Sequence, residues 1–117
     1  MSSHDPQMLK GVLALLLLHE LAREDSYGYS VLAHLQSRGF DDLGEGTVYP
    51  ALTRLENSGL AESYLRRSET GPARKYYRLT EAGRAELGHR TSSWHALVEA
   101  VDRVLDRPIQ TPLPPKE

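Results

Sequence analysis

The sequence predicts a mainly α-helical α+β fold, in which three helices and a small β-hairpin are followed by one long helix. Three observations lead to this prediction. Apolar residues recur at helical spacing in four separate stretches, a Tyr- and Arg-rich segment alternates with the period of a β-strand, and glycine or proline separates these segments. A chain of 117 residues has the usual size of one domain.

The first two helices are expected in the N-terminal third of the chain. Over residues 8–21, apolar residues return every three or four positions with almost no helix breaker, which predicts a helix with a broad buried face. A shorter apolar repeat lies between Gly28 and Gly39, and glycine is typical of the end of a helix. The longest apolar run, residues 12–18, is too short to span a membrane.

The third expected helix contains a proline. Pro50 has no N–H, which is tolerated best in the first helical turn, so we expect the helix to begin at residues 46–49 and to end at Gly59. The helical repeat then assigns a buried stripe and an opposite, exposed face. The stripe consists of Val48, Leu52 and Leu55, and the exposed face of Thr47, Tyr49, Pro50, Thr53, Arg54 and Asn57. Tyr49 is expected to be exposed, with no core to fill.

The β-hairpin is expected to be the cationic part of the molecule. Its strands are predicted at residues 60–67 and 74–79, joined by a polar tip. Five basic residues flank the tip, against one acid: Arg66, Arg67, Arg74, Lys75, Arg78 and Glu69. Consecutive strand residues point to opposite faces, so only one of Arg66 and Arg67 can share a surface with Arg74.

Charge is distributed unevenly along the chain. The formal net charge of −2 argues weakly against a nucleic-acid partner. However, residues 1–45 carry three basic and seven acidic side chains, whereas residues 60–84 carry six basic and three acidic ones. Any surface that binds a polyanion is therefore expected in the second half.

A long helix is expected from residue 81 to residue 107, because Thr80 is a good N-cap and Pro108 should prevent its continuation. Its stripe repeats in steps of four and three. The stripe consists of Leu87, Thr91, Trp94, Leu97, Val98, Val101, Val104 and Leu105. A single helix cannot bury such a stripe on a domain that ends near residue 80, so we expect a second copy of the chain to cover it.

These elements divide the chain into four parts: a flexible N-terminus at residues 1–7, a globular domain at 8–80, a dimerisation helix at 81–107 and a disordered Pro-rich tail at 108–117. The order of elements is that of a winged helix-turn-helix followed by a dimerisation helix. This order predicts a DNA-binding dimer, whose third helix enters the major groove while the basic hairpin reaches phosphates.

Four motifs lie at the starts of the three expected helices and at the end of the hairpin. They are Leu9-Lys10-Gly11, Tyr27-Gly28-Tyr29, GTVYPALTRLE at residues 46–56 and KYYRLTEAG at residues 75–83. Over residues 8–106 the chain resembles the PadR family of bacterial transcriptional regulators, and its single C-terminal helix is similar to the small-subunit branch. The resemblance implies a homodimeric repressor that leaves a pseudo-palindromic operator when a small aromatic or drug-like effector binds.

The resemblance also implies roles for individual residues. The residues expected to contact DNA are Lys10, Tyr29, Thr47, Tyr49, Thr53, Arg54, Arg74 and Lys75. Tyr27 and Tyr29 have the alternative role of packing the start of the second helix. In multidrug-binding members of the small-subunit branch, a tryptophan of the last helix lines a cavity between subunits, and Trp94 occupies a comparable place. The set expected to bind an effector or to pack the dimer interface is Trp94, Leu97, Val98, Val101 and Leu105.

Other function classes are disfavoured. The absence of cysteine, of a phosphate-binding glycine loop and of an HExxH motif argues against an enzyme, and we expect no cofactor. His95, Glu99 and Asp102 have metal-ligand spacing but no supporting partner, so no metal is expected. The other histidines, His4, His19, His34 and His89, are expected on the surface. We expect a cytoplasmic, nucleoid-associated protein; the alternative is a winged-helix protein-interaction module without DNA binding.

Overall fold

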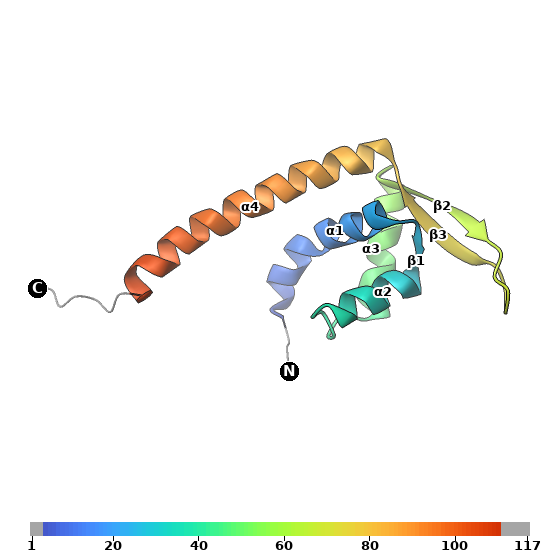
Figure 1. Ribbon diagram of the computed structural model, residues 1–117, viewed down its shortest axis with the longest axis horizontal. Coiled ribbons are helices and arrows are strands. Elements are labelled where there is room, and N and C mark those ends of the chain that lie inside the picture. Colours follow the sequence, from blue (N-terminus) through green and yellow to red (C-terminus); the bar gives the residue numbers. More distant parts are fainter. Residues whose placement is uncertain (1–3, 111–117) are drawn as a thin grey trace, which may run out of the picture. The chain divides into compact units, whose positions relative to one another are not determined.

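The computed structural model describes the backbone of residues 4–110 and the side chains of residues 4–106. Its elements follow in this order: α1 (Pro6–Arg23), β1 (Ser26–Tyr27), α2 (Gly28–Ser37), α3 (Glu45–Asn57), β2 (Ala61–Arg66), β3 (Arg74–Leu79) and α4 (Glu81–Gln110) (Figure 1). The chain forms two compact units, of which the first extends to Leu87 and the second begins at Gly88, within α4. Helices together with a small antiparallel sheet confirm the predicted α+β class.

Helix α1 begins before the apolar repeat that predicts it. The Asp5 carboxylate caps the helix by accepting a hydrogen bond from the backbone N–H of Gln7, at 2.8 Å. Pro6 fits the first helical position because no intrahelical hydrogen bond is lost there. The expectation of a flexible segment at residues 1–7 is therefore wrong where the helix and its cap begin, because capping residues are polar and lie outside the apolar pattern. Residues 1–3 lie outside the described residues.

Leucine and valine side chains from α1, α2 and α3 form the core of the first unit. Leu17, Val48 and Leu52 are completely buried, and each such side chain contributes roughly 1.5–3 kcal/mol relative to an exposed position. The predicted stripe of α3 is confirmed, since Leu55 lies in this core together with Val48 and Leu52. The sheet closes the core with Ala61, Tyr77 and Leu79.

Helix α3 contains Pro50 as its sixth residue. The prediction that Pro50 lies in the first turn, with the helix beginning at residues 46–49, is wrong. Proline at this position removes the backbone hydrogen bond to the carbonyl of Gly46. Both residues are exposed, so water can satisfy that carbonyl. Gly59 follows the helix with a left-handed φ of 79° and ends it as predicted.

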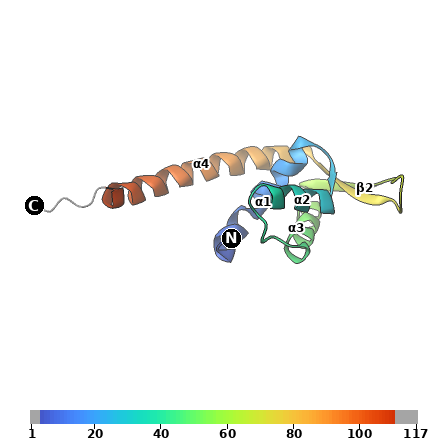
Figure 2. The same cartoon turned by 60° about the horizontal axis from the view of Figure 1, so that its bottom comes forward.

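The predicted hairpin is confirmed as strands β2 and β3, but the sheet has a third strand that the sequence does not predict. Strand β1 pairs with β3 and gives the antiparallel order β1-β3-β2. Its two residues are too few to show an alternating pattern. In both views the hairpin projects from the helices of the first unit (Figure 1 and Figure 2).

The register of the sheet decides which side chains share a face. Tyr76 of β3 lies opposite both Tyr64 of β2 and Tyr27 of β1. Nearer the hairpin tip, Arg66 of β2 lies opposite Arg74 of β3. Because side chains alternate along a strand, these residues share one face, which we call the outer face of the sheet. The alternate residues of β3, which share the opposite, inner face, are Lys75, Tyr77 and Leu79.

The start of α4 depends on a cap and a glycine. The Thr80 hydroxyl accepts a hydrogen bond from the backbone N–H of Gly83, at 3.0 Å, and donates one to the carbonyl of Gly59, at 2.7 Å. These bonds confirm Thr80 as the N-cap. A Cβ at Gly83 would overlap the carbonyl oxygen of Leu60, so the close approach of α4 to the preceding chain requires glycine.

Helix α4 continues to Gln110, and the prediction that Pro108 prevents its continuation is wrong. Proline removes one backbone hydrogen bond and bends a helix, but the remaining bonds can carry the helix past it. The expected disordered tail begins at residue 108, and its part from residue 111 onward lies outside the described residues. None of the helices within the described residues combines the length and apolar character needed to cross a membrane.

Candidate nucleic-acid interface

Helix α3 presents side chains that the sequence predicts to contact DNA. Thr47, Thr53 and Arg54 are exposed. The Thr53 hydroxyl donates to the carbonyl of Tyr49, at 3.2 Å, and its oxygen keeps lone pairs for a partner outside the protein. An exposed helix face of this kind fits the major groove of DNA.

Tyr49 is half-buried, and the prediction that it has no core to fill is wrong. Its ring lies against Gly28, where an added Cβ would stand 2.8 Å from Cε1 and 3.1 Å from Cδ1 of the ring. Burial raises the pKa of the Tyr49 hydroxyl, and the charge of Glu45 adds to this effect. The hydroxyl therefore stays protonated at neutral pH and can donate a hydrogen bond.

Four tyrosine rings form a row that leads from the start of α2 across the sheet; we call it the tyrosine row. The ring centroids of Tyr29 and Tyr27 lie 6.4 Å apart, those of Tyr27 and Tyr76 lie 5.4 Å apart, and those of Tyr76 and Tyr64 lie 5.9 Å apart. Tyr27 is half-buried in the row, whereas Tyr29 remains 59% exposed at its end. Tyr27 therefore packs at the start of α2, which is the alternative role considered for both tyrosines, while Tyr29 is exposed enough to contact a ligand.

Three arginines lie over rings of the tyrosine row: Arg66, Arg74 and Arg78, and the guanidinium carbon of Arg78 lies 4.8 Å from the ring centroid of Tyr64. The guanidinium carbon of Arg74 lies 4.7 Å from the ring centroid of Tyr27, and its Nη1 donates to the Tyr27 hydroxyl at 3.2 Å. That of Arg66 lies 4.0 Å from the Tyr76 centroid, and its Nη2 donates to the Tyr64 hydroxyl at 3.2 Å. Because all three arginines are exposed to water, these cation–π contacts orient the arginines more than they stabilise the fold.

Lys75 lies on the inner face and has a partner there. Its Nζ is 3.2 Å from Oε1 of Glu56, whose Oε2 accepts a hydrogen bond from the Ser63 hydroxyl at 2.6 Å. The hydrogen bond from Ser63, followed by that from Lys75, holds the pKa of Glu56 below its usual value. The hydrogen bond to Glu56 raises the pKa of Lys75. Lys75 is therefore charged and already paired, on the opposite face of the sheet from Arg74.

Arg78 shares the outer face with Arg66 and Arg74 but is also paired. Its Nε donates to Oε2 of Glu62 at 3.1 Å, and its Nη1 lies 3.9 Å from Oδ2 of Asp25. The same Asp25 oxygen accepts a hydrogen bond from the Tyr64 hydroxyl at 2.6 Å, and this bond raises the pKa of Tyr64. The acids of this face thus lie at the end where Arg78 is, away from the hairpin tip.

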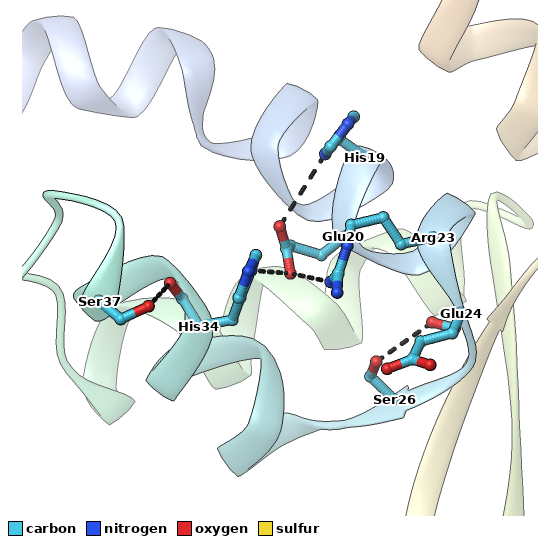
Figure 3. Close-up of polar contacts among 7 residues, drawn as sticks. All are labelled: His19, Glu20, Arg23, Glu24, Ser26, His34 and Ser37. Atoms are coloured by element: carbon cyan, nitrogen blue, oxygen red, sulfur yellow. Dashed lines mark hydrogen bonds and ion pairs between the residues drawn. The ribbon is translucent and has the colours of Figure 1, made fainter.

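A buried carboxylate joins α1 to α2 (Figure 3). Oε1 of Glu20 lies 2.7 Å from Nδ1 of His34 and 3.2 Å from Nη1 of Arg23, and its Oε2 lies 3.9 Å from Nδ1 of His19. His34 is therefore half-buried and not a surface residue as expected. The contact fixes α2, which carries Tyr29, against α1.

Residues 17–89 match the transcriptional regulator PadR-like family, and this match covers more than half of the sequence. The chain belongs to the PadR-like family. Its members are transcriptional regulators, so this PadR-like protein is a transcriptional regulator and not an enzyme. No curated protein sequence matches it.

Solved structures of PadR-like proteins are similar over most of their length. A PadR-like transcriptional regulator from Bacillus cereus is 38% identical, with a TM-score of 0.78 and coverage of 85% of this chain and 96% of that one. A PadR family regulator from Eggerthella lenta is 33% identical, with a TM-score of 0.76 and coverage of 86% and 88%. One from Clostridium difficile is 32% identical, with a TM-score of 0.74 and coverage of 80% and 98%. The winged helix-turn-helix fold predicted from the sequence is thereby confirmed.

The second unit of this PadR-like protein carries the residues predicted for the effector site or dimer interface. Trp94, Leu97, Val101 and Leu105 are exposed on α4, at 40%, 58%, 42% and 51% of their surface, respectively, while Val98 is half-buried. Large apolar side chains along one exposed helix indicate a surface that another molecule covers.

The sequence prediction for this PadR-like protein includes Arg74 but omits Arg66 and the tyrosines beneath the two arginines. Alternation along the strand leaves open whether Arg66 or Arg67 shares the face of Arg74. The register of β2 against β3 assigns this place to Arg66. The same alternation places Arg74 and Lys75, which are consecutive in β3, on opposite faces of the sheet. This separation can be predicted from the sequence alone.

Proposed function

We propose that this PadR-like regulator binds a pseudo-palindromic DNA operator as a homodimer and represses transcription. The observation that carries the proposal is an unbroken series of side-chain contacts on the first unit, which links α3 to the cationic hairpin. The exposed face of α3 leads through Tyr49, packed on Gly28, to Tyr29 and then along the tyrosine row to Arg74. Base-reading and phosphate-binding side chains therefore lie on connected elements.

The proposed contacts divide into two classes. Thr47, Tyr49, Thr53 and Arg54 of α3 are assigned to the major groove. Lys10, Tyr29 and Arg74 are assigned to backbone phosphates, and Lys10 and Arg74, like Tyr29, are exposed. Lys75 joins them only when its ammonium leaves Glu56. A regulator that binds bacterial DNA through these contacts would be a cytoplasmic, nucleoid-associated protein.

Helix α4 is the proposed dimerisation element. Two copies that pack along Trp94, Val98, Val101 and Leu105 would bury the apolar stripe of each helix. A dimer of this kind presents two α3 helices to successive major grooves and therefore requires two half-sites.

A small aromatic effector is the proposed release signal. Bound beside Trp94 between two α4 helices, it would change their crossing angle and hence the spacing of the two α3 helices. Coupling between sites is typically about 1–3 kcal/mol, which weakens operator binding about 5- to 150-fold. In the alternative, Trp94 only packs the interface, and no aromatic compound changes operator affinity.

A protein-interaction module without DNA binding is the second candidate. Its support is the pairing of Lys75 with Glu56 and of Arg78 with Glu62 and Asp25, which neutralises positive charge on the hairpin of a chain whose net charge is −2.

Fluorescence anisotropy separates the two candidates. The protein is titrated into labelled duplex from the DNA upstream of its own gene, with a scrambled duplex as control, at two salt concentrations. Tight, salt-dependent binding to the upstream duplex, lost in Arg54→Ala and kept in Arg84→Ala, supports the regulator. Equally weak binding to both duplexes contradicts it and favours the interaction module.

A further inference from the structure

We propose that Arg66 and Arg74 form a clamp for a DNA backbone phosphate, and that Tyr27, Tyr64 and Tyr76 are positioning residues that hold its two guanidinium groups in place. This inference rests on the proposed DNA binding. It adds a specific phosphate subsite on the outer face of the sheet and assigns Arg66 to the interface.

The first argument is the cross-strand placement of two like charges. Arg66 and Arg74 are direct partners in the antiparallel register of β2 and β3, and like charges opposite each other destabilise a sheet. An anion placed between the two guanidinium groups would relieve this repulsion. Arginine is suited to the task because its planar fork binds two oxygens of one phosphate.

The second argument is the distribution of carboxylates on the outer face. Asp25 and Glu62 both contact Arg78, and Asp25 also accepts the Tyr64 hydroxyl. Within the described residues, Arg66 and Arg74 have neutral tyrosines as their partners and no ion pair with a carboxylate. Their two positive charges are therefore available to an external anion, in contrast to those of Arg78 and Lys75.

The third argument is preorganisation. Each guanidinium lies on a tyrosine ring and donates a hydrogen bond to a tyrosine hydroxyl, so its long side chain is already oriented before the phosphate arrives. Tyr76 lies centrally, between Tyr27 and Tyr64, and beneath Arg66. A guanidinium on an aromatic ring keeps most of its five donors free for another ligand. The rings therefore fix the arginines without consuming their capacity to bind a phosphate.

The direction of the tyrosine row identifies duplex DNA as the source of the phosphate. The row runs from Arg66 and Arg74 to Tyr29 at the start of α2, which is the segment against which Tyr49 of α3 packs. When α3 occupies a major groove, the DNA phosphate backbone that borders this groove passes beside the tyrosine row.

The test compares neighbouring arginines of equal charge. Arg67 adjoins Arg66 in the chain but lies just beyond the end of β2, so Arg67→Ala is the matched control for Arg66→Ala. Binding to a generic 20-base-pair duplex at low salt is measured by anisotropy, because a phosphate clamp does not depend on base sequence. Arg66→Ala should lower the salt slope of log K by about 0.9, the value for one phosphate contact, whereas Arg67→Ala should leave the slope unchanged.

The role of the tyrosines is tested with both arginines present. Tyr76→Leu should weaken binding about two- to tenfold, which is the cost of ordering one long side chain on binding, whereas Tyr76→Phe, which keeps the ring, should bind like the wild type. In the Arg66→Ala background, Tyr76→Leu should have little further effect. Thermal unfolding of each variant separates loss of the clamp from loss of the fold.

The outcomes separate the clamp from the proposed function. If the wild type binds DNA and Arg66→Ala and Arg67→Ala lower the salt slope equally, the clamp is overturned and the proposed DNA binding stands. Full additivity of Arg66→Ala and Tyr76→Leu overturns the positioning role of the tyrosine. If the wild type binds neither the generic duplex nor its upstream DNA, the proposed function and the clamp are both overturned.

Discussion

The contact between Gly28 and Tyr49 makes a sharp prediction about DNA binding. A Cβ at position 28 would stand 2.8 Å from Cε1 of the Tyr49 ring, whereas carbon atoms in contact normally lie about 3.5–4.0 Å apart. In Gly28→Ala the ring must therefore move by roughly 1 Å. The ring end of Tyr49 can turn away from the helix, so the fold should accommodate this change.

Stability and operator affinity should respond differently to Gly28→Ala. Gly28 is the first residue of α2 and the atoms nearest to an added Cβ belong to the movable ring of Tyr49, so the free energy of unfolding should change little. Operator binding should lose the contact of Tyr49, worth about 1 kcal/mol or roughly a fivefold change in Kd. Anisotropy titration measures the Kd, and thermal unfolding by circular dichroism measures the stability.

Two further variants make the Gly28→Ala experiment decisive. Gly11→Ala introduces the same methyl group into α1, where its Cβ would meet no atom within 4 Å apart from the adjoining residues and the helix's own backbone, and it should leave operator affinity unchanged. Tyr49→Ala removes the ring itself and should weaken binding at least as much as Gly28→Ala. Unchanged affinity in Gly28→Ala, combined with weak binding in Tyr49→Ala, would refute the argument that Gly28 sets the position of the ring.

Three other predictions concern separate parts of the molecule. Gly83→Ala should destabilise the protein by about 1–3 kcal/mol, because its Cβ meets the rigid backbone carbonyl of Leu60; a thermal midpoint equal to that of the wild type would contradict this. Glu56→Gln should strengthen DNA binding by releasing Lys75. The lowered pKa of Glu56 means that its contribution to stability is present above the ordinary carboxyl pKa and is lost as pH falls through the lowered value, so Glu56→Gln should flatten the stability profile on the acid side. Val101→Glu should dissociate the dimer, as measured by sedimentation equilibrium, because it introduces a charge into the apolar stripe of α4; an unchanged mass would count against α4 as the interface.

Helical periodicity predicts most of the fold. The repeat of Val48, Leu52 and Leu55 assigns the buried side of α3 correctly, because a helix on a core must place its apolar residues on one side. Thr80 is predicted as a cap from its type and place alone. Both inferences need only local sequence, which explains their success.

The errors arise where distant segments meet. Strand β1 exists because Ser26 and Tyr27 pair with β3, about fifty residues away, and no pattern within two residues can report this. His34 is half-buried because Glu20 of another helix reaches it. Tyr49 is half-buried because glycine at position 28 leaves room for its ring.

The candidate site was only partly accessible from the sequence for the same reason. The cationic character of the hairpin follows from composition, but the division of its charges does not. Arg66 and Arg74 are joined by cross-strand register, and Lys75 is paired by Glu56 from α3. A count of basic residues therefore overestimates the charge that this surface offers to DNA.

Hydroxyl-radical footprinting of the protein on its upstream DNA tests the central claim most directly. A homodimer that places two α3 helices in the major groove predicts two protected regions related by a twofold axis, with centres separated by about 10–10.5 base pairs or a multiple of that spacing. Protection at both regions should weaken together in Arg54→Ala. A single asymmetric region, or no protection at concentrations where the protein is dimeric, would contradict the account.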